Sequence, residues 1–204
     1  INEKILNVSR RSKYLLFYFK KKILLVHLGM TGKFFLLKTY DNIMYRTSFY
    51  YNLNILPKHN HIYFYLNNGF VMIYNDTRRF GFFKFYKRKN LAEISFLKKL
   101  GLEPFNKLFN TEYFKNFGKS KRKNIKNLLM DQNFVSGLGN IYVNEVLFKS
   151  KIHPLRVCGN IRTKEIKKLI LNIKKILNFA ISKGGSSIKD FKNTLGRDGS
   201  FQQF

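Results

Sequence analysis

The chain is poor in cysteine, proline and tryptophan. It contains one cysteine, Cys158, three prolines and no tryptophan among 204 residues. A single thiol excludes an internal disulfide and a cysteine-based zinc site within this chain, and it is typical of a reducing, intracellular compartment such as the cytoplasm. No apolar run reaches the length of a membrane span, and the first residues, INEKILNVSRRSKYLL, lack the long apolar core of a signal peptide. We therefore expect no cofactor, no metal and no membrane partner for this chain.

Acidic residues are also scarce. Asp and Glu total 11 against 39 Lys and Arg, which gives a formal net charge of +28. An AT-rich genome would explain many of the lysines, but it would not explain the shortage of Asp and Glu. A surplus of this size on a short chain favours a polyanionic partner, usually nucleic acid, over the alternatives of a membrane surface or a ribosomal assembly.

The first half of the chain consists of short β-branched and aromatic runs. From Lys13 to Phe85 the runs KYLLFYF, KILLVHLGM, KFFLL, HIYFYL, FVMIYN and FGFFKFY are separated by turn signals such as KKK, MTG and NNG. This pattern is typical of antiparallel strands. LNNGFV predicts a hairpin, because Asn-Gly tolerates the positive φ angles of a two-residue loop. We expect an antiparallel β-sandwich or barrel over residues 1–90.

The second half has helical periodicity. LAEISFLKKLG places apolar residues at three- and four-residue spacings and ends at Gly101, which predicts a helix with a glycine stop. NIKNLLMDQ, NIYVNEVLFKS and TKEIKKLILNIKKILNFAISKGG continue the pattern, the last with an apolar face opposite a lysine face. The predicted fold class is therefore α+β with two domains, in which a helical domain over residues 91–204 follows the sandwich and the boundary falls between 88 and 105.

Asn140 stands between a glycine-rich turn and a helix in the stretch DQNFVSGLGNIYVNEVLF. The unpaired N–H groups and the dipole of a helix start attract anions, so a phosphate could bind there with the Asn140 amide as an additional donor. The simpler interpretation is that Asn140 caps the helix. Spacing alone favours the cap.

The same region, written as MDQNFVSGLGNIYVNEVLFKSKIHPLR, resembles the helix-two-turn-helix motif of formamidopyrimidine-DNA glycosylases. Four further motifs follow the order of that family: RRSKYLL, HLGMTG, KHNHIYFYLNNGFVMIYNDTRRFG and GGSSIKDF. The resemblance covers nearly the whole chain, and DTRRFG favours this family over the related endonuclease VIII branch. It implies a β-sandwich and a helical domain with DNA between them, and base-excision repair of 8-oxoguanine and formamidopyrimidines in double-stranded DNA by a monomeric glycosylase and abasic-site lyase.

The resemblance assigns phosphate contacts to individual positions. Lys13, His27 and Asn140 are expected to grip the phosphates that flank the damaged nucleotide, because the strand must be held while a base is rotated out of the stack. Arg79 is expected to hold phosphate, and Lys121, within the basic run KSKRKNIK, to add affinity through counterion release. Without the family, the favoured interpretations are an exposed strand-edge lysine for Lys13, a structural histidine for His27 and a solvated face for the basic run.

The resemblance also assigns the base-flipping residues. Met30 is expected to enter the void left by the flipped base, while Arg78 and Phe80 fill and bridge the opposite strand, as apolar wedges and cations do in other kinked duplexes. The alternative for Met30 is a core residue that folds back. Ser186 and Ser187 lie in a Gly-rich segment that in the family closes over the everted base, and are weak individual candidates because that loop reads the base largely through backbone amides.

The chain departs from the family in several places. Members begin with a proline whose free amine attacks the sugar, followed by a glutamate, and they end in a four-cysteine zinc ribbon; zinc is thus expected in full-length members. This chain starts at Ile1 and ends in FQQF, so we expect truncation at both ends and assign no catalytic residue. Glu3 is not a substitute, and residual lyase chemistry by another amine is the less favoured outcome. Thr77 replaces the usual proline of DPRRFG, and GLEP replaces GPEP.

Two rival functions remain open from the sequence. A catalytically inactive relative would bind damaged duplex without covalent trapping. A basic RNA-binding protein would prefer structured RNA and would tolerate loss of Met30 or Phe80, although the pairing of Arg78 with Phe80 has no role in reading A-form RNA. The preferred lesion is not set by distinctive side chains.

Overall fold

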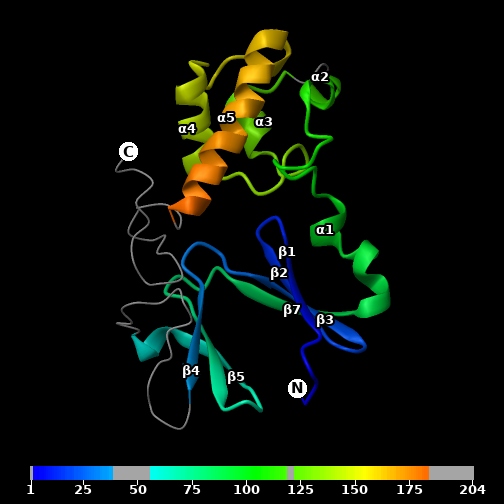
Figure 1. Cartoon of the computed structure of the whole chain (residues 1–204), viewed down its shortest axis with the longest axis vertical. Helices are drawn as coiled ribbons and strands as arrows, with labels where there is room; N and C mark the ends of the chain where they lie inside the picture. The colour runs from blue at the N-terminus through cyan, green and yellow to red at the C-terminus, as the bar shows by residue number, and fades with distance from the viewer. Residues whose placement is uncertain (1, 39–55, 119–121, 184–204) are drawn as a thin grey trace. The chain divides into compact units, whose positions relative to one another are not determined.

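The computed structural model describes residues 2–38, 56–118 and 122–183. In these ranges strands come first and helices follow (Figure 1). The strands are β1 (Asn7–Arg11), β2 (Tyr14–Tyr18), β3 (Lys22–His27), β4 (Lys33–Lys38), β5 (Asn60–Tyr65), β6 (Phe70–Asn75) and β7 (Phe82–Lys87). The helices are α1 (Ser95–Lys98), α2 (Thr111–Gly118), α3 (Ile125–Met130), α4 (Asn140–Ser150) and α5 (Thr163–Ser182), with short 3-10 turns η1 (Pro57–His59), η2 (Arg88–Glu93) and η3 (Cys158–Asn160). The predicted α+β class, with antiparallel strands before helices, is confirmed.

The strands form two sheets, with orders β1-β2-β3-β7 and β4-β6-β5. In the second sheet β6 pairs antiparallel with both neighbours, for example Phe34 with Tyr74 and Tyr63 with Ile73. The predicted β5–β6 hairpin is present. Its turn has one positive φ, at Gly69 (78°), so the loop needs only the glycine in the left-handed region and not the preceding asparagine.

Aromatic rings pack between the two sheets. Phe34 of β4 lies 5.9 Å from Phe17 of β2 and 6.0 Å from Phe83 of β7, measured between ring centroids, and Tyr74 of β6 lies 4.7 Å from Phe83. β3 is apolar along most of its length, and its residues Ile23 to Val26 are all buried. The sheets therefore share an apolar core, as expected of a sandwich.

The helices have a core of their own around Phe134. This ring is fully buried and makes edge or tilted contacts with Phe109, Phe114 and Phe117, and a stacked contact with Tyr113 at 5.6 Å. α5 buries one face, as its periodicity predicts. The buried apolar residues of that face are Ile166, Leu169, Ile170, Ile173, Ile176 and Ala180.

The described residues divide into two compact units that interleave along the chain. The helical unit contains residues 2–13, 18–23, 86–118 and 122–179, and the sandwich unit contains 14–17, 24–38, 56–85 and 180–183. The proposed division into domains 1–90 and 91–204 stays a prediction.

The continuous helix expected to end at Gly101 is wrong. η2 and the four-residue α1 are separated at Ile94, whose backbone is extended (φ −60°, ψ 111°) and whose side chain is 2% exposed. Gly101 does not stop a helix either. A Cβ there would lie 2.3 Å from the backbone oxygen of Asn133, so the glycine is needed because two backbone segments pass close together.

Candidate nucleic-acid interface

Lys13 lies in the turn between β1 and β2, and its ammonium group reaches the N-terminus of α4. Its Nζ donates a hydrogen bond to the backbone oxygen of Leu138 at 3.0 Å, across 125 positions of the chain. A Cβ added to Gly139 would lie 3.6 Å from the same nitrogen. The residue as a whole is exposed, yet partial burial lowers the pKa of Lys13.

Asn140 is the first residue of α4 and not its cap. Gly139 occupies the N-cap position, with φ −129° and ψ 175°, and no side chain caps the helix. The helix-cap interpretation is therefore wrong. The exposed Asn140 side chain makes no hydrogen bond within the described part of the chain, and the first turn of α4 contains no acidic residue. Because a helix start attracts anions, Lys13, Asn140 and the first turn of α4 form a place suited to a phosphate group, here called the α4 anion site.

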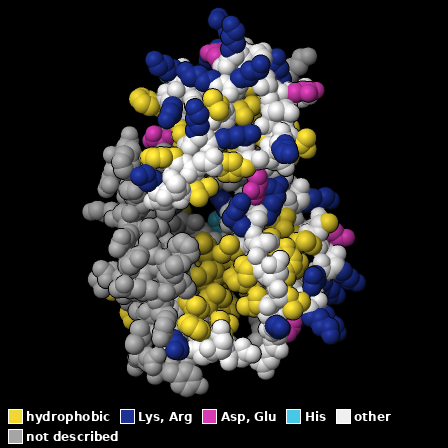
Figure 2. All heavy atoms as spheres, viewed as in Figure 1, with side chains coloured by type: hydrophobic (Ala, Val, Ile, Leu, Met, Phe, Trp, Pro, Cys, Tyr) yellow, Lys and Arg dark blue, Asp and Glu magenta, His cyan; other side chains and the backbone are white. Residues whose placement is uncertain are grey.

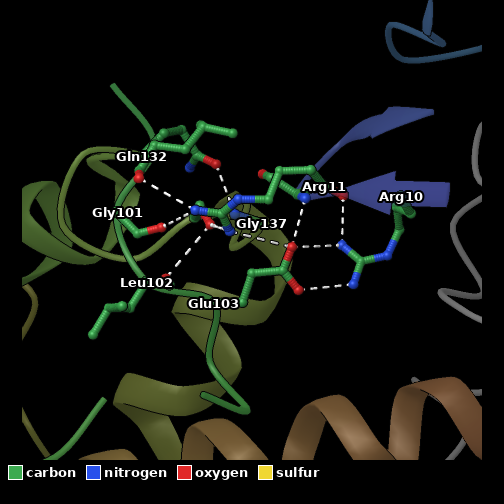
Figure 3. A network of polar contacts seen from close by, with 10 residues as sticks. Arg10, Arg11, Gly101, Leu102, Glu103, Gln132 and Gly137 are labelled. Atoms are coloured by element: carbon green, nitrogen blue, oxygen red, sulfur yellow. Dashed lines mark hydrogen bonds and ion pairs between the residues drawn. The ribbon is translucent and has the colours of Figure 1, made fainter. Parts of the chain in front are cut away.

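A network of polar contacts fixes the β1–β2 turn beside this site (Figure 3). Both nitrogens at the end of Arg10 donate to the Glu103 carboxylate, at 3.1 and 2.8 Å, and the backbone N–H of Ser12 donates to Glu103 Oε1 at 2.7 Å. Arg11 donates to the backbone oxygen of Gly101 at 2.7 Å and to Ser136 Oγ at 3.0 Å. Two consecutive arginines thus bind the turn that carries Lys13 to the segments that precede α4.

Glu103 is a residue that sequence reasoning missed. Burial raises the pKa of its carboxyl, but hydrogen bonds from Arg10 and from the Ser12 backbone outweigh this, so the pKa of Glu103 is lowered overall. The signal was present, since Glu103 is one of few acids in a very basic chain and lies in the GLEP motif. Its partners are 91 and 93 residues away, however, and no local spacing indicates such a pairing.

His27 lies at the end of β3 in the sandwich unit, among aromatic rings. Its ring is nearly parallel to that of Phe82, at 5.6 Å and 10°, and lies 5.2 Å from Tyr14. The backbone N–H of Gly29 donates to His27 Nδ1 at 3.0 Å. Because Nδ1 accepts this hydrogen bond, the proton of the neutral ring lies on Nε2. Nε2 can therefore donate to an acceptor such as a phosphate oxygen.

Met30, Arg78 and Phe80, here called the wedge residues, lie on two loops of the same unit. Met30 is 43% exposed and Phe80 is 55% exposed, so the alternative that Met30 folds back into the core is wrong. The Arg78 guanidinium carbon lies 4.6 Å from the centroid of the Phe80 ring. Arg79, between Arg78 and Phe80, is exposed, and its backbone lies in the left-handed region (φ 56°). Exposed apolar side chains beside a cation suit insertion between base pairs.

The helical unit and the sandwich unit each hold one set of the predicted residues. Lys13 and Asn140 meet in the helical unit, while His27 and the wedge residues belong to the sandwich unit. Lys121, Ser186 and Ser187 lie outside the described residues. Figure 2 shows Lys and Arg side chains spread over the visible face with few Asp or Glu among them, in keeping with the net charge.

The described residues do not fit a zinc site. Within residues 2–38, 56–118 and 122–183 no three His, Cys, Asp or Glu side chains gather as metal ligands would. Cys158 is buried and its thiol is 3.6 Å from the backbone oxygen of Gly118. In the same ranges no helix has both the length and the apolar character needed to cross a membrane.

Comparison with known proteins defines the class and then the family. Antiparallel strands followed by helices, a net charge of +28 and a lysine at a helix start are features of the class of nucleic-acid-binding proteins. The family model described as "Formamidopyrimidine-DNA glycosylase N-terminal domain" matches residues 1–83, and that described as "Formamidopyrimidine-DNA glycosylase H2TH domain" matches residues 100–192. The chain belongs to the formamidopyrimidine-DNA glycosylase family.

Individual relatives agree with this membership. The formamidopyrimidine-DNA glycosylases of Streptococcus agalactiae serotype III and Rickettsia conorii are each 42% identical to the chain over 202 residues, which is 98% of this chain and 68% and 69% of the relatives. A solved complex of the Lactococcus lactis Fpg protein with DNA containing an abasic site has a TM-score of 0.80 at 33% identity, covering 98% of this chain and 69% of that one. A complex of the same protein with Fapy-dG-containing DNA has the same TM-score, identity and coverage.

Proposed function

We propose that this chain binds damaged double-stranded DNA and everts oxidised purines, 8-oxoguanine and formamidopyrimidines, for base-excision repair. The observation that carries the proposal is the group of exposed wedge residues on a protein of net charge +28. Large apolar side chains exposed next to a cation are costly in a protein that stays in water, but they suit a protein that fills a void in a base stack. The DNA named in the titles of the Lactococcus lactis complexes supports this choice of partner.

The α4 anion site and His27 supply the grip in this proposal. Lys13 and Asn140 would bind one phosphate at the start of α4, and His27 would donate from Nε2 to another. Arg79 and Lys121 would add contacts to the backbone. A grip on the strand is required because rotating a base out of the stack costs a few kcal/mol, which contacts to the flanking phosphates must offset.

The chemistry that follows eversion is glycosidic bond cleavage and strand elimination, as expected of a glycosylase and abasic-site lyase. An unprotonated amine attacks the sugar C1′ and displaces the base, and the Schiff base that then forms on ring opening loses a proton and eliminates the strand phosphate. We assign no described residue as that amine. Ser186 and Ser187 are proposed to belong to the loop that covers the everted base. The described residues contain no group of three or more His, Cys, Asp or Glu side chains that could hold the zinc expected in full-length family members. One chain carries every assigned DNA contact, so we propose a monomer associated with DNA inside the cell.

Duplex binding with matched variants tests the proposal. The affinity of the chain is measured for duplexes that contain an abasic site, 8-oxoguanine opposite cytosine, or no damage. Wild type is expected to prefer the damaged duplexes, and Met30→Ala and Phe80→Ala each to lower the preference about tenfold, the loss of about 1.4 kcal/mol of stacking. Tyr65→Ala is the control, because Tyr65 is 79% exposed in the same unit but lies on β5, outside the wedge loops.

Borohydride trapping on the same duplexes separates the rival functions. A covalent adduct shows that an amine of this chain reacts with the abasic sugar, in support of lyase activity. Preference for damaged duplex without an adduct identifies a damage-recognising protein without a nucleophile of its own. Equal binding of damaged and undamaged duplex, together with tighter binding of structured RNA, overturns the proposal in favour of an RNA-binding protein.

A further inference from the structure

Asp76 is a carboxylate with no solvent exposure, directly after β6. It accepts hydrogen bonds from Thr31 Oγ1 at 2.5 Å and from the Tyr74 hydroxyl at 2.8 Å. It also accepts from the backbone N–H groups of Arg78 at 3.2 Å and Gly81 at 2.9 Å. All four donors are neutral groups, which is an uncommon way to hold a buried charge and requires that each donor be fixed in direction.

Three of these four donors come from the two loops that carry the wedge residues, and the fourth, Tyr74, lies on β6. The first loop joins β3 to β4 and contains Met30 next to Thr31. The second joins β6 to β7 and contains Arg78 and Phe80, with the N–H groups of Arg78 and Gly81 on either side of Phe80. The Thr31 hydroxyl acts on both loops at once, because it donates to Asp76 and accepts from the Arg78 N–H at 3.1 Å.

Steric contact supports the same connection. A Cβ added to Gly29, in the first loop, would lie 2.7 Å from the backbone carbon of Phe80 and 2.7 Å from the nitrogen of Gly81. The two loops thus touch through their backbones as well as through the carboxylate. Neither contact involves the exposed ends of the wedge residues.

We propose that Asp76 and Thr31 are positioning residues that hold Met30 in register with Arg78 and Phe80, so that the three side chains enter the duplex as one rigid body. The inference rests on the proposed function. Its physical basis is that a group fixed before binding loses little conformational freedom on binding, whereas two independent loops would each have to be ordered by the DNA. A carboxylate that only stabilised the sandwich could be held by donors from strands, whereas Asp76 is held by donors from both wedge loops.

Thr31→Val tests the inference because it removes the hydroxyl that joins the loops and nearly conserves the shape. Tyr74→Phe is the matched control, since it removes one hydrogen bond from the same carboxylate but from a strand and not from a wedge loop. Thr31→Val is expected to lower the preference for abasic over undamaged duplex about tenfold, a change of about 1.4 kcal/mol, with little change in binding to undamaged duplex. Tyr74→Phe and Thr31→Ser, which keeps the hydroxyl, are expected to retain the preference.

A double-mutant cycle with Met30→Ala distinguishes a positioning role of Thr31 from a purely structural one, because only a positioning role couples the effects of the two substitutions on the preference for abasic duplex. If Thr31 acts through Met30, the Thr31→Val/Met30→Ala double variant loses little more preference than Met30→Ala alone, whereas independent effects multiply. Two results overturn this inference and leave the proposed function standing. In the first, the losses of preference in the two single variants multiply in the double variant. In the second, Thr31→Val keeps its preference for abasic duplex while Met30→Ala loses it. If Met30→Ala also keeps its preference, the proposed function falls with it. Should Thr31→Val fail to fold, as judged by its thermal transition, Thr31→Ala is measured against the same criteria.

Discussion

Replacing Glu103 by alanine is expected to loosen the turn that presents Lys13. The Glu103 carboxylate is the shared acceptor of the Arg10 side chain and the Ser12 backbone N–H. Arg11 loses its ion pair with Glu103, at 3.4 Å, but retains its hydrogen bonds to Gly101 and Ser136, so the turn keeps one of its two anchors. The change therefore isolates the contribution of one carboxylate.

The magnitude follows from the burial of the partners. Ser12 is 5% exposed, so its N–H would be left unsatisfied, at a cost of about 1–3 kcal/mol. The Arg10 side chain is 56% exposed, so the loss of its ion pair costs only about 0.2–1 kcal/mol. We expect Glu103→Ala to lower the free energy of unfolding by about 2–3 kcal/mol, and Glu103→Gln by about 1 kcal/mol because an amide oxygen still accepts from Ser12.

Urea unfolding followed by circular dichroism measures both values, with Arg10→Ala as the control. Arg10→Ala is expected to cost at most about 1 kcal/mol. The reasoning is refuted if the alanine and glutamine variants of Glu103 lose the same stability, or if Arg10→Ala loses as much as Glu103→Ala. Either result would mean that the exposed ion pair, and not the buried backbone donor, carries the effect.

Three further outcomes are expected. Lys13→Met should weaken duplex binding and reduce the slope of the logarithm of the binding constant against the logarithm of salt concentration by about one phosphate contact. In the same salt titration Lys149→Met, at the other end of α4, should leave both the affinity and the slope unchanged. Phe134→Ala should lower the free energy of unfolding by about 3–5 kcal/mol in urea, because the ring is fully buried among four others. The pKa values of Asp76 and Glu103 are lowered in the folded chain, so both carboxylates stabilise the fold above their unfolded pKa values near pH 4, and this stabilisation is lost as the pH falls through the folded pKa values. The urea midpoint should therefore fall between pH 7 and pH 3, and it should fall less in Glu103→Gln.

Local periodicity predicted the elements that bury one face. The apolar face of α5 and the hairpin at Gly69 could be predicted because each depends on residues within one or two turns of each other. The continuous helix ending at Gly101 could not be corrected from sequence, because Gly101 is required by its contact with the backbone of Asn133, 32 positions away.

In the candidate site, too, local features could be predicted from the sequence and contacts between distant segments could not. The helix start at Asn140 was visible in the spacing of its glycines, but the approach of Lys13 to that start joins segments 125 residues apart. Only the family resemblance placed the two residues together before the structure did. Glu103 and Asp76 escaped even the resemblance, because they act through other residues and their donors lie up to 93 and 45 positions away.

The position of Lys13 has a consequence for the free protein. An ammonium group beside the N-terminus of α4 faces the positive end of the helix dipole, so without a bound anion the two repel each other. The folded chain therefore tolerates a repulsion that a bound phosphate would relieve. Lys13→Met removes this repulsion of about 0.3–1 kcal/mol together with the Lys13 hydrogen bond to Leu138, which is worth about as much, so the melting temperature of the free protein should change little. The same variant should lose much of the thermal stabilisation that duplex DNA confers.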